Sequence, residues 1–146
     1  MSQQRRDPQF RVRRRQLGRP AGAGRAQHHE KYGDNGTVWA PATQNGVVQS
    51  STLAFPTPVY ASAVLVRETY GNGFVRKIFA MDTQGGVHQV WAGKDTCQPD
   101  YTVNFIATFP KTDYLVRGVK IVIDPNHNQN ACEEIDAVQL HGRAEK

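Results

Sequence analysis

The stretch Tyr101–Phe109 (YTVNFIATF) alternates between two kinds of side chain along its length. Aromatic and aliphatic side chains occupy the odd-numbered positions, whereas the even-numbered positions hold Thr, Asn, Ile and Thr. Successive side chains of a strand point to opposite faces of a sheet, so this alternation predicts a strand with one packed face and one half-polar face. A strand of that kind is typical of an antiparallel sheet.

Runs of similar character lie on both sides of this strand. They are rich in β-branched and aromatic residues and show no helical 3.6-residue period. Turn residues such as Pro56–Pro58, Gly71–Gly73 and Gln84–Gly86 separate them. The further strands expected are Val47–Phe55, Tyr60–Thr69, Phe74–Met81, Val87–Ala92, Tyr114–Asp124 and Glu134–His141.

This pattern predicts an all-β fold, an antiparallel jelly-roll β-sandwich of about eight strands. Gly118 interrupts the longest run, and we expect a β-bulge there because glycine offers a strand no side chain to pack. The length of 146 residues suits a single domain. No apolar run approaches the roughly 18 residues that a transmembrane helix needs, so none is expected.

The sequence contains none of the motifs of common catalytic sites that we sought. These were the nucleophile elbow, the phosphate-binding glycine-rich loop and the His-Glu metalloprotease pattern. Gly71–Gly73 stands between two expected strands, whereas a dinucleotide-binding loop would need a following helix. We therefore expect a protein that is not an enzyme.

The net charge of +5 is unevenly distributed. Residues 1–28 carry eight arginines and one acidic residue, whereas residues 29–146 carry ten basic and twelve acidic residues. We therefore expect two parts, an extended basic N-terminal arm over residues 1–28 and a slightly acidic β-sandwich over residues 29–146. The arm is rich in Arg like a mitochondrial presequence, but its apolar residues form no helical stripe, and it lacks the apolar segment of a secretory signal.

Two interpretations of this arm stay open. It is either a solvated tail or a segment that binds RNA, anionic lipid or an acidic protein. In the second case the contacts would come from its clustered arginines, Arg5, Arg6, Arg11, Arg13, Arg14 and Arg15.

Three segments carry a resemblance to a known family. They are Ala61–Gly73 (ASAVLVRETYGNG) with its spacing to Val90-Trp91, Glu133–Gly142 (EEIDAVQLHG) and Tyr32–Pro41 (YGDNGTVWAP). Over roughly Lys31 to Gly142 the chain resembles a galactose-binding-like, discoidin-type β-sandwich. It is similar to the domain at the N-terminus of a eukaryotic F-box leucine-rich-repeat adaptor and to its bacterial relatives. The resemblance implies a domain that binds glycans, lipids or proteins without catalysing a reaction.

The resemblance also implies a structural Ca²⁺ site that ties the first loop to the last strand. The ligands implied are Asp34, Thr37 and Glu134, with the carbonyl oxygen of Glu133, and hard cations do take oxygen donors of these kinds. The order Asp34-Asn35-Gly36 departs from the usual Asp-Gly-Asn of such loops. A loop that is held by hydrogen bonds alone, with Asp34 capping a turn, therefore stays open as the alternative.

A ligand surface is expected at the loops of one end of the sandwich. An aromatic ring there would stack on the apolar face of a sugar, while amide and imidazole groups would bind hydroxyl groups. Trp39 and Trp91 are expected to pack inside instead, as large aromatic residues usually do. The candidate ligand-binding residues are Tyr70, Asn72, Phe74, His127 and Asn128.

Two candidate functions from different classes follow from these observations. In the first function, the domain is a recognition module that binds a carbohydrate or a similar polar ligand through these loops. In the second, it is an accessory structural subunit of a large assembly, anchored by its arginine-rich arm.

Cys97 and Cys132 either pair as a disulfide in an oxidising compartment or remain free thiols.

Overall fold

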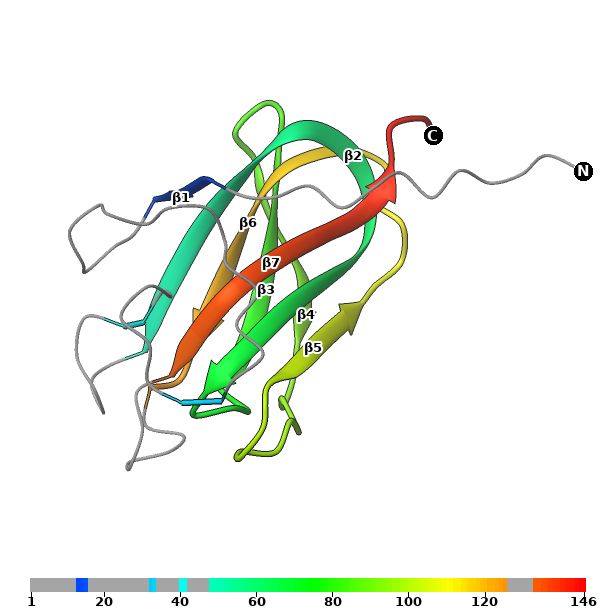
Figure 1. Ribbon diagram of the computed structural model, residues 1–146. Coiled ribbons are helices and arrows are strands. Elements are labelled where there is room, and N and C mark those ends of the chain that lie inside the picture. Colours follow the sequence, from blue (N-terminus) through cyan, green and yellow to red (C-terminus); the bar gives the residue numbers. More distant parts are fainter. Residues whose placement is uncertain (1–12, 16–31, 34–39, 42–47, 126–132) are drawn as a thin grey trace, which may run out of the picture.

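The computed structural model describes residues 13–15, 32–33, 40–41, 48–125 and 133–146 (Figure 1). Within these ranges the chain is all-β, every strand pairing is antiparallel, and no helix is present that could span a membrane. The strands are β1 (Arg13–Arg15), β2 (Gln49–Tyr70), β3 (Val75–Asp82), β4 (Val87–Ala92), β5 (Val103–Thr108), β6 (Leu115–Ile123) and β7 (Glu134–Arg143).

The predicted fold class is confirmed, and the bounds of β3 to β7 agree with the prediction to within two residues. The main difference concerns β2, where two separate strands were expected. The chain instead runs as one strand of 22 residues through Pro56 and Pro58. A proline cannot donate a ladder hydrogen bond, but its fixed φ of about −65° suits extended backbone. The prolines therefore bend the strand without ending it.

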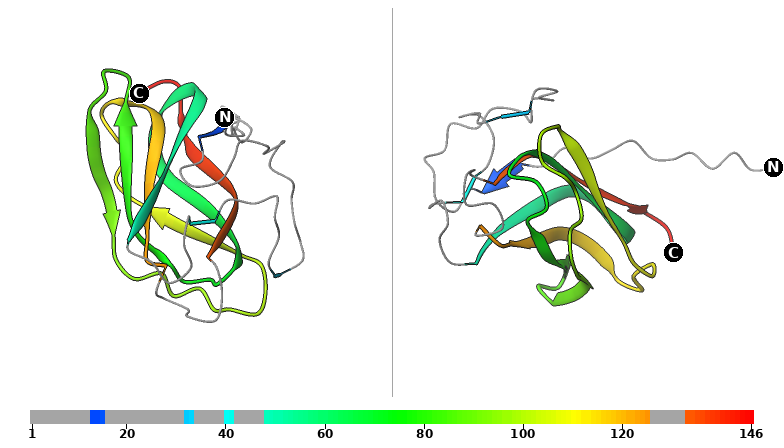
Figure 2. Two further views of the ribbon diagram at one scale, coloured as in Figure 1. Left: turned by 90° about the vertical axis from the view of Figure 1, so that its left-hand side faces the viewer. Right: turned by 90° about the horizontal axis from the view of Figure 1, so that it is seen from below.

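This bend lets β2 belong to both layers of the sandwich (Figure 2). Its first half pairs with β6, and the register shifts between Ala54 and Val59, where the prolines lie. Its second half pairs with β5 on one side and β7 on the other. One layer therefore has the order β1-β2-β6-β3-β4, and the other places β5 and β7 beside the end of β2.

The hydrophobic core fills the space between the two layers. Phe105 and Ala107 of β5 are buried while Ile106 is 55% exposed, which confirms the alternation expected for this strand. Trp91 of β4 is partly buried and meets the Phe105 ring edge-on at 5.1 Å, so it packs as predicted, whereas Trp39 lies outside the described residues. The largest fully buried apolar side chains are Phe74, Ile78, Ile121, Ile123, Val59, Val64, Val66 and Val75.

The irregularity predicted at Gly118 is confirmed. Gly118 pairs with Ala54 of β2 and with Met81 of β3, and both ladders shift register just beyond it. A Cβ atom at this position would lie 2.8 Å from the carbonyl oxygen of Leu53. The close approach of β2 therefore requires glycine here.

Part of the expected arm joins the sheet. The three arginines Arg13–Arg15 form β1 and pair with Thr52–Ala54 of β2. Arg5, Arg6 and Arg11 lie outside the described residues. Binding of the arm to RNA, lipid or acidic protein therefore stays a prediction, as does the boundary between residues 28 and 29.

Candidate functional site

The candidate site lies at one end of the sandwich, which we call the loop end and define as residues 68–74, 93–102 and 133–136. Strand β2 ends there, β3 and β7 begin there, and the β4–β5 connection crosses it (Figure 1). The pairing of Tyr70 with Glu134 joins the last residue of β2 to the first of β7. Segments far apart in the sequence therefore meet at the end where a ligand surface was predicted.

Asn72 holds the loop end together from the inside. Its side chain is fully buried, and its Nδ2 group donates to the carbonyl oxygens of Gln98, at 3.0 Å, and Tyr101, at 2.7 Å. The flanking Gly71 and Gly73 have φ values of 63° and 95°, which glycine adopts without strain. This tight turn directs the amide inward, where Asn72 supports the loop, and a direct contact of Asn72 with a ligand stays a prediction.

Phe74 was also expected to contact a ligand. Its side chain is 0% exposed and belongs to the hydrophobic core. A ring in this position cannot stack on a sugar. His127 and Asn128, the other late-loop candidates, lie outside the described residues.

Asn72→Ala is expected to lower the free energy of unfolding by about 1–3 kcal/mol, because it leaves two carbonyl oxygens without their donor. Urea denaturation of the wild type and the variant measures this. Gln98→Ala is the control, because it keeps the main-chain acceptor and removes only an exposed side chain. Equal losses in the two variants would contradict the role assigned to the Asn72 amide.

Tyrosine side chains form the outer part of the loop end. Tyr70 is half-buried and meets the ring of Tyr32 edge-on at 5.3 Å, while the Tyr32 hydroxyl accepts a hydrogen bond from the Gly71 N–H at 3.2 Å. Tyr101 is 55% exposed. It follows Asp100, whose φ of 82° is uncommon for a residue other than glycine and costs free energy. The loop that presents Tyr101 is therefore held in a defined conformation by the Asn72 amide.

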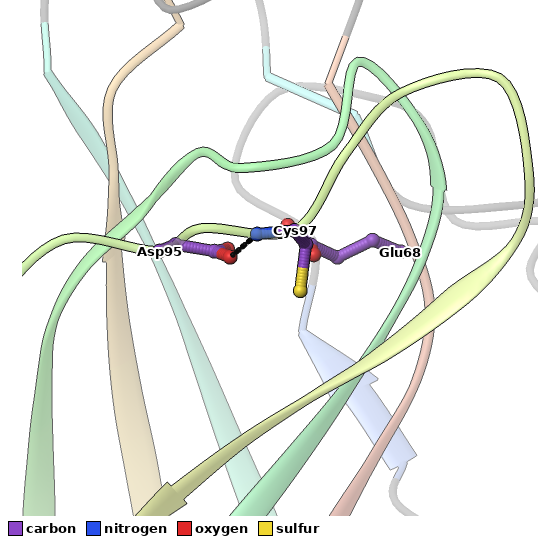
Figure 3. Close-up of side chains that lie close together, drawn as sticks. All are labelled: Glu68, Asp95 and Cys97. Atoms are coloured by element: carbon purple, nitrogen blue, oxygen red, sulfur yellow. Dashed lines mark hydrogen bonds between the residues drawn. The ribbon is translucent and has the colours of Figure 1, made fainter.

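At the same loop end, the side chains of Glu68, Asp95 and Cys97 converge (Figure 3). One ligand atom from each lies within 4.8 Å of the other two. Glu68 Oε1 accepts a hydrogen bond from the Gly73 N–H at 3.1 Å. The two oxygens of Asp95 accept hydrogen bonds from the N–H groups of Cys97, at 2.9 Å, and Val75, at 3.3 Å. Backbone donors thus fix both carboxyl groups.

Burial shifts the titration of this cluster. Loss of hydration raises the pKa of Glu68 to about 9, and the hydrogen bond to Asp95 and its negative charge act in the same direction. Burial, the hydrogen bond to Asp95 and the charge of Glu68 also raise the pKa of the Cys97 thiol above its usual range. At neutral pH Glu68 is therefore uncharged. Cys97 forms no disulfide within the described residues, and because Cys132 lies outside them, the pairing of the two cysteines stays an open prediction.

Comparison with known proteins identifies the fold. Neither a scan of protein-family models nor a search of curated proteins finds a match. Among solved structures, the NMR structure of the N-terminal domain of the single-strand break repair protein XRCC1 is 13% identical, with 90% of this chain and 99% of that chain covered and a TM-score of 0.63. This chain has the galactose-binding-like fold.

Two further structures with this fold are bound to different partners. Reduced XRCC1 bound to the DNA polymerase β catalytic domain is 15% identical, covers 92% of this chain and 99% of its own, and has a TM-score of 0.60. The CBM32 of AlyQ, in complex with 4,5-unsaturated mannuronic acid, is 16% identical, covers 91% and 97%, and has a TM-score of 0.58. At these identities the likeness shows the galactose-binding-like fold alone.

The calcium ligands predicted from the family resemblance are only partly described. Glu134 begins β7 and is 1% exposed, and its neighbour Glu133 is fully buried as well. Asp34 and Thr37 lie outside the described residues, so a Ca²⁺ site in this galactose-binding-like domain stays a prediction.

The sequence interpretation missed Glu68 and Asp95. Glu68 continues the inward-facing series of Val64 and Val66, and all three side chains are 0% exposed. An acidic residue at an inward position of a strand was therefore a readable signal, because glutamate is almost never fully buried without a partner. Asp95 stands in an irregular connection, and no periodicity marks it as buried.

Glu68→Gln is expected to stabilise the domain by on the order of 2 kcal/mol at pH 9 in metal-free buffer, and by less at acidic pH. Between about pH 4.5, the ordinary pKa, and about pH 9, the folded state keeps a proton on Glu68 that the unfolded state releases. Rising pH therefore lowers the stability of the wild type. Glutamine stays neutral, and its amide oxygen can still accept from the Gly73 N–H.

Chemical denaturation of wild type and variant across this pH range tests the expectation. Glu145→Gln, at an exposed C-terminal position, is the matched control and should leave the pH dependence unchanged. If the free energy of unfolding of the wild type and of Glu68→Gln changed with pH by the same amount, the pKa of Glu68 would not be raised in the folded state.

Proposed function

We propose that this domain is a non-catalytic recognition module that binds a carbohydrate or a similar polar ligand at the loop end. The observation that carries the proposal is the exposed side chain of Tyr101, whose backbone is held by the Asn72 amide beside the turn that follows Tyr70. A preorganised aromatic ring loses little conformational freedom when it packs against the apolar face of a sugar.

The burial of the acidic groups supports a binding role over a catalytic one. Glu68 is 0% and Asp95 2% exposed, so these carboxyl groups lie under the surface that a substrate would reach. A general acid or base must come within hydrogen-bond distance of the reacting group. The two carboxyl groups therefore support the loops instead of presenting themselves to a ligand.

Ligands bound to other proteins with this fold are compatible with the proposal. The CBM32 of AlyQ is in complex with a sugar acid, and XRCC1 is bound to the DNA polymerase β catalytic domain. For this chain we favour an uncharged sugar, because residues 29–146 carry two more acidic than basic residues. An acidic sugar would meet net repulsion from this domain.

Tyr101→Ala is expected to weaken sugar binding about tenfold or more, because it removes the exposed stacking surface. Tyr70→Ala should weaken it less, since that ring is half-buried against Tyr32. A glycan array identifies a bound sugar, and calorimetry with that sugar measures the two variants.

Two controls separate the loop end from other surfaces. Ile106→Ala removes a side chain that is also 55% exposed, on the outer face of β5. His88→Ala removes an imidazole that stacks on Tyr114 at 4.1 Å and contacts Asp82 at 2.8 Å, in the β3–β4 hairpin far from the loop end. Binding that survives Tyr101→Ala but is lost in His88→Ala would place the ligand elsewhere and refute the proposal.

A further inference from the structure

We propose that Glu68, Asp95 and Cys97 form a binding site for a divalent transition-metal ion of the zinc class. The site shares no residue with the Ca²⁺ position expected at Asp34, Thr37 and Glu134, and it does not depend on the proposed sugar binding. Glu68 lies near the C-terminal end of β2, whereas Asp95 and Cys97 lie in the β4–β5 connection. Their donor atoms, two carboxylate oxygens and one sulfur, lie within 4.8 Å of one another.

A buried oxygen that no N–H group satisfies points to a cation in this cluster. The Glu68 side chain is 0% exposed, and its Oε2 atom accepts no hydrogen bond from an N–H group of the described residues, so only Asp95 and Cys97, the other members of the cluster, face it. Figure 3 shows this side chain directed toward Cys97 and Asp95. A buried oxygen without an N–H donor is unfavourable, and a bound cation would satisfy it.

The donor set selects the class of metal. Zinc accepts thiolate sulfur at about 2.3 Å and carboxylate oxygen at about 2.0–2.2 Å, which places donors of a tetrahedral site about 3.3–3.7 Å apart. Ca²⁺ requires six to eight oxygen donors and Mg²⁺ an octahedron of oxygens, so neither suits a thiolate with two carboxylates. Three protein donors leave a fourth position for water, and Cys97 is half-buried, so one donor of the cluster is partly exposed to solvent.

The cluster is largely preorganised. Asp95 is oriented by the N–H groups of Cys97 and Val75, and Glu68 by the N–H of Gly73. Each carboxylate oxygen retains lone pairs for a metal after accepting one hydrogen bond. The Asn72 amide fixes the segment that follows Cys97 through the Gln98 carbonyl. Little conformational freedom therefore remains to be lost when the ion binds.

Cobalt(II) is the probe of choice, because a thiolate bound to cobalt gives a charge-transfer absorption band. The full chain, freed of metal by a chelator, is titrated with Co²⁺ and then with Zn²⁺, which should displace the cobalt at one ion per chain. Cys97→Ser should abolish the band, and Glu68→Gln and Asp95→Asn should weaken binding about tenfold or more. Cys132→Ser and Glu145→Gln are the matched controls and should retain both band and affinity, with folding of every variant checked by circular dichroism.

A second measurement uses only the wild-type chain. Zn²⁺ should slow alkylation of Cys97 by iodoacetamide, as followed by mass spectrometry of the peptides that contain Cys97 and Cys132. Ca²⁺ at the same concentration should leave this rate unchanged. The proposal is overturned if no thiolate band forms, if Cys132→Ser and not Cys97→Ser abolishes it, or if Zn²⁺ leaves the alkylation of Cys97 unaffected.

Discussion

Phe74→Ala is expected to lower the free energy of unfolding by about 3–5 kcal/mol. The ring is fully buried among core residues of both layers. Its own backbone carbonyl accepts a hydrogen bond from the Asp124 N–H at 2.9 Å, which keeps the surrounding backbone in place. The structure can therefore collapse only in part around the cavity that the substitution leaves. Urea denaturation at neutral pH measures the loss.

The matched control is Tyr101→Ala, which also removes an aromatic ring from the loop end but at a position 55% exposed. We expect that variant to lose less than about 1 kcal/mol, because its ring contacts mostly solvent. The comparison also separates the two roles considered for Phe74. If Phe74→Ala kept its stability and lost ligand binding, the ring would belong to the binding surface after all.

Gly142→Val is expected to destabilise the domain by about 3 kcal/mol or more, because the new side chain has no room. Gly142 pairs with Ala61 where β7 runs beside the bend of β2. A Cβ atom there would collide with the carbonyl oxygen of Tyr60 and lie 2.9 Å from Val59 Cγ2. The first of these contacts is with backbone, so the strands themselves would have to separate. Thermal and urea denaturation both report the loss.

Ala144→Val is the control for this second substitution, since it adds a branched side chain two residues later at an exposed position. It should change the stability by less than about 0.5 kcal/mol. A Gly142→Val protein as stable as the Ala144→Val protein would mean that β7 and β2 do not approach each other this closely.

Local sequence patterns were sufficient for most of the strands and for their antiparallel character. Period-two alternation places Phe105 and Ala107 inside because side-chain direction in a strand depends only on local geometry. Alternation does not place Phe74, which directly follows a turn and was expected on the ligand surface from its position beside that turn. Both Gly71 and Gly73 adopt positive φ, so the chain turns within three residues. After such a turn, an odd or even position in the sequence no longer indicates which way a side chain points.

The continuity of β2 also lay beyond the sequence pattern. Prolines at positions 56 and 58 are equally typical of a loop and of a bent strand, because each residue satisfies the same backbone preference in both. Pairing decides between the two outcomes. Here β6 holds the first half, and β5 and β7 hold the second, so the chain remains extended across the bend.

Alternation, turn residues and family resemblance together indicated an antiparallel galactose-binding-like sandwich and the end at which its loops gather. These features arise from preferences of a few neighbouring residues, which a sequence displays directly. Only the tertiary structure showed that Glu68 of β2 meets Asp95 and Cys97 of a distant connection, with their donor atoms within 4.8 Å. That meeting depends on how the ends of β2 and β4 are packed across two layers, and the raised pKa of Glu68 follows from the burial that this packing imposes.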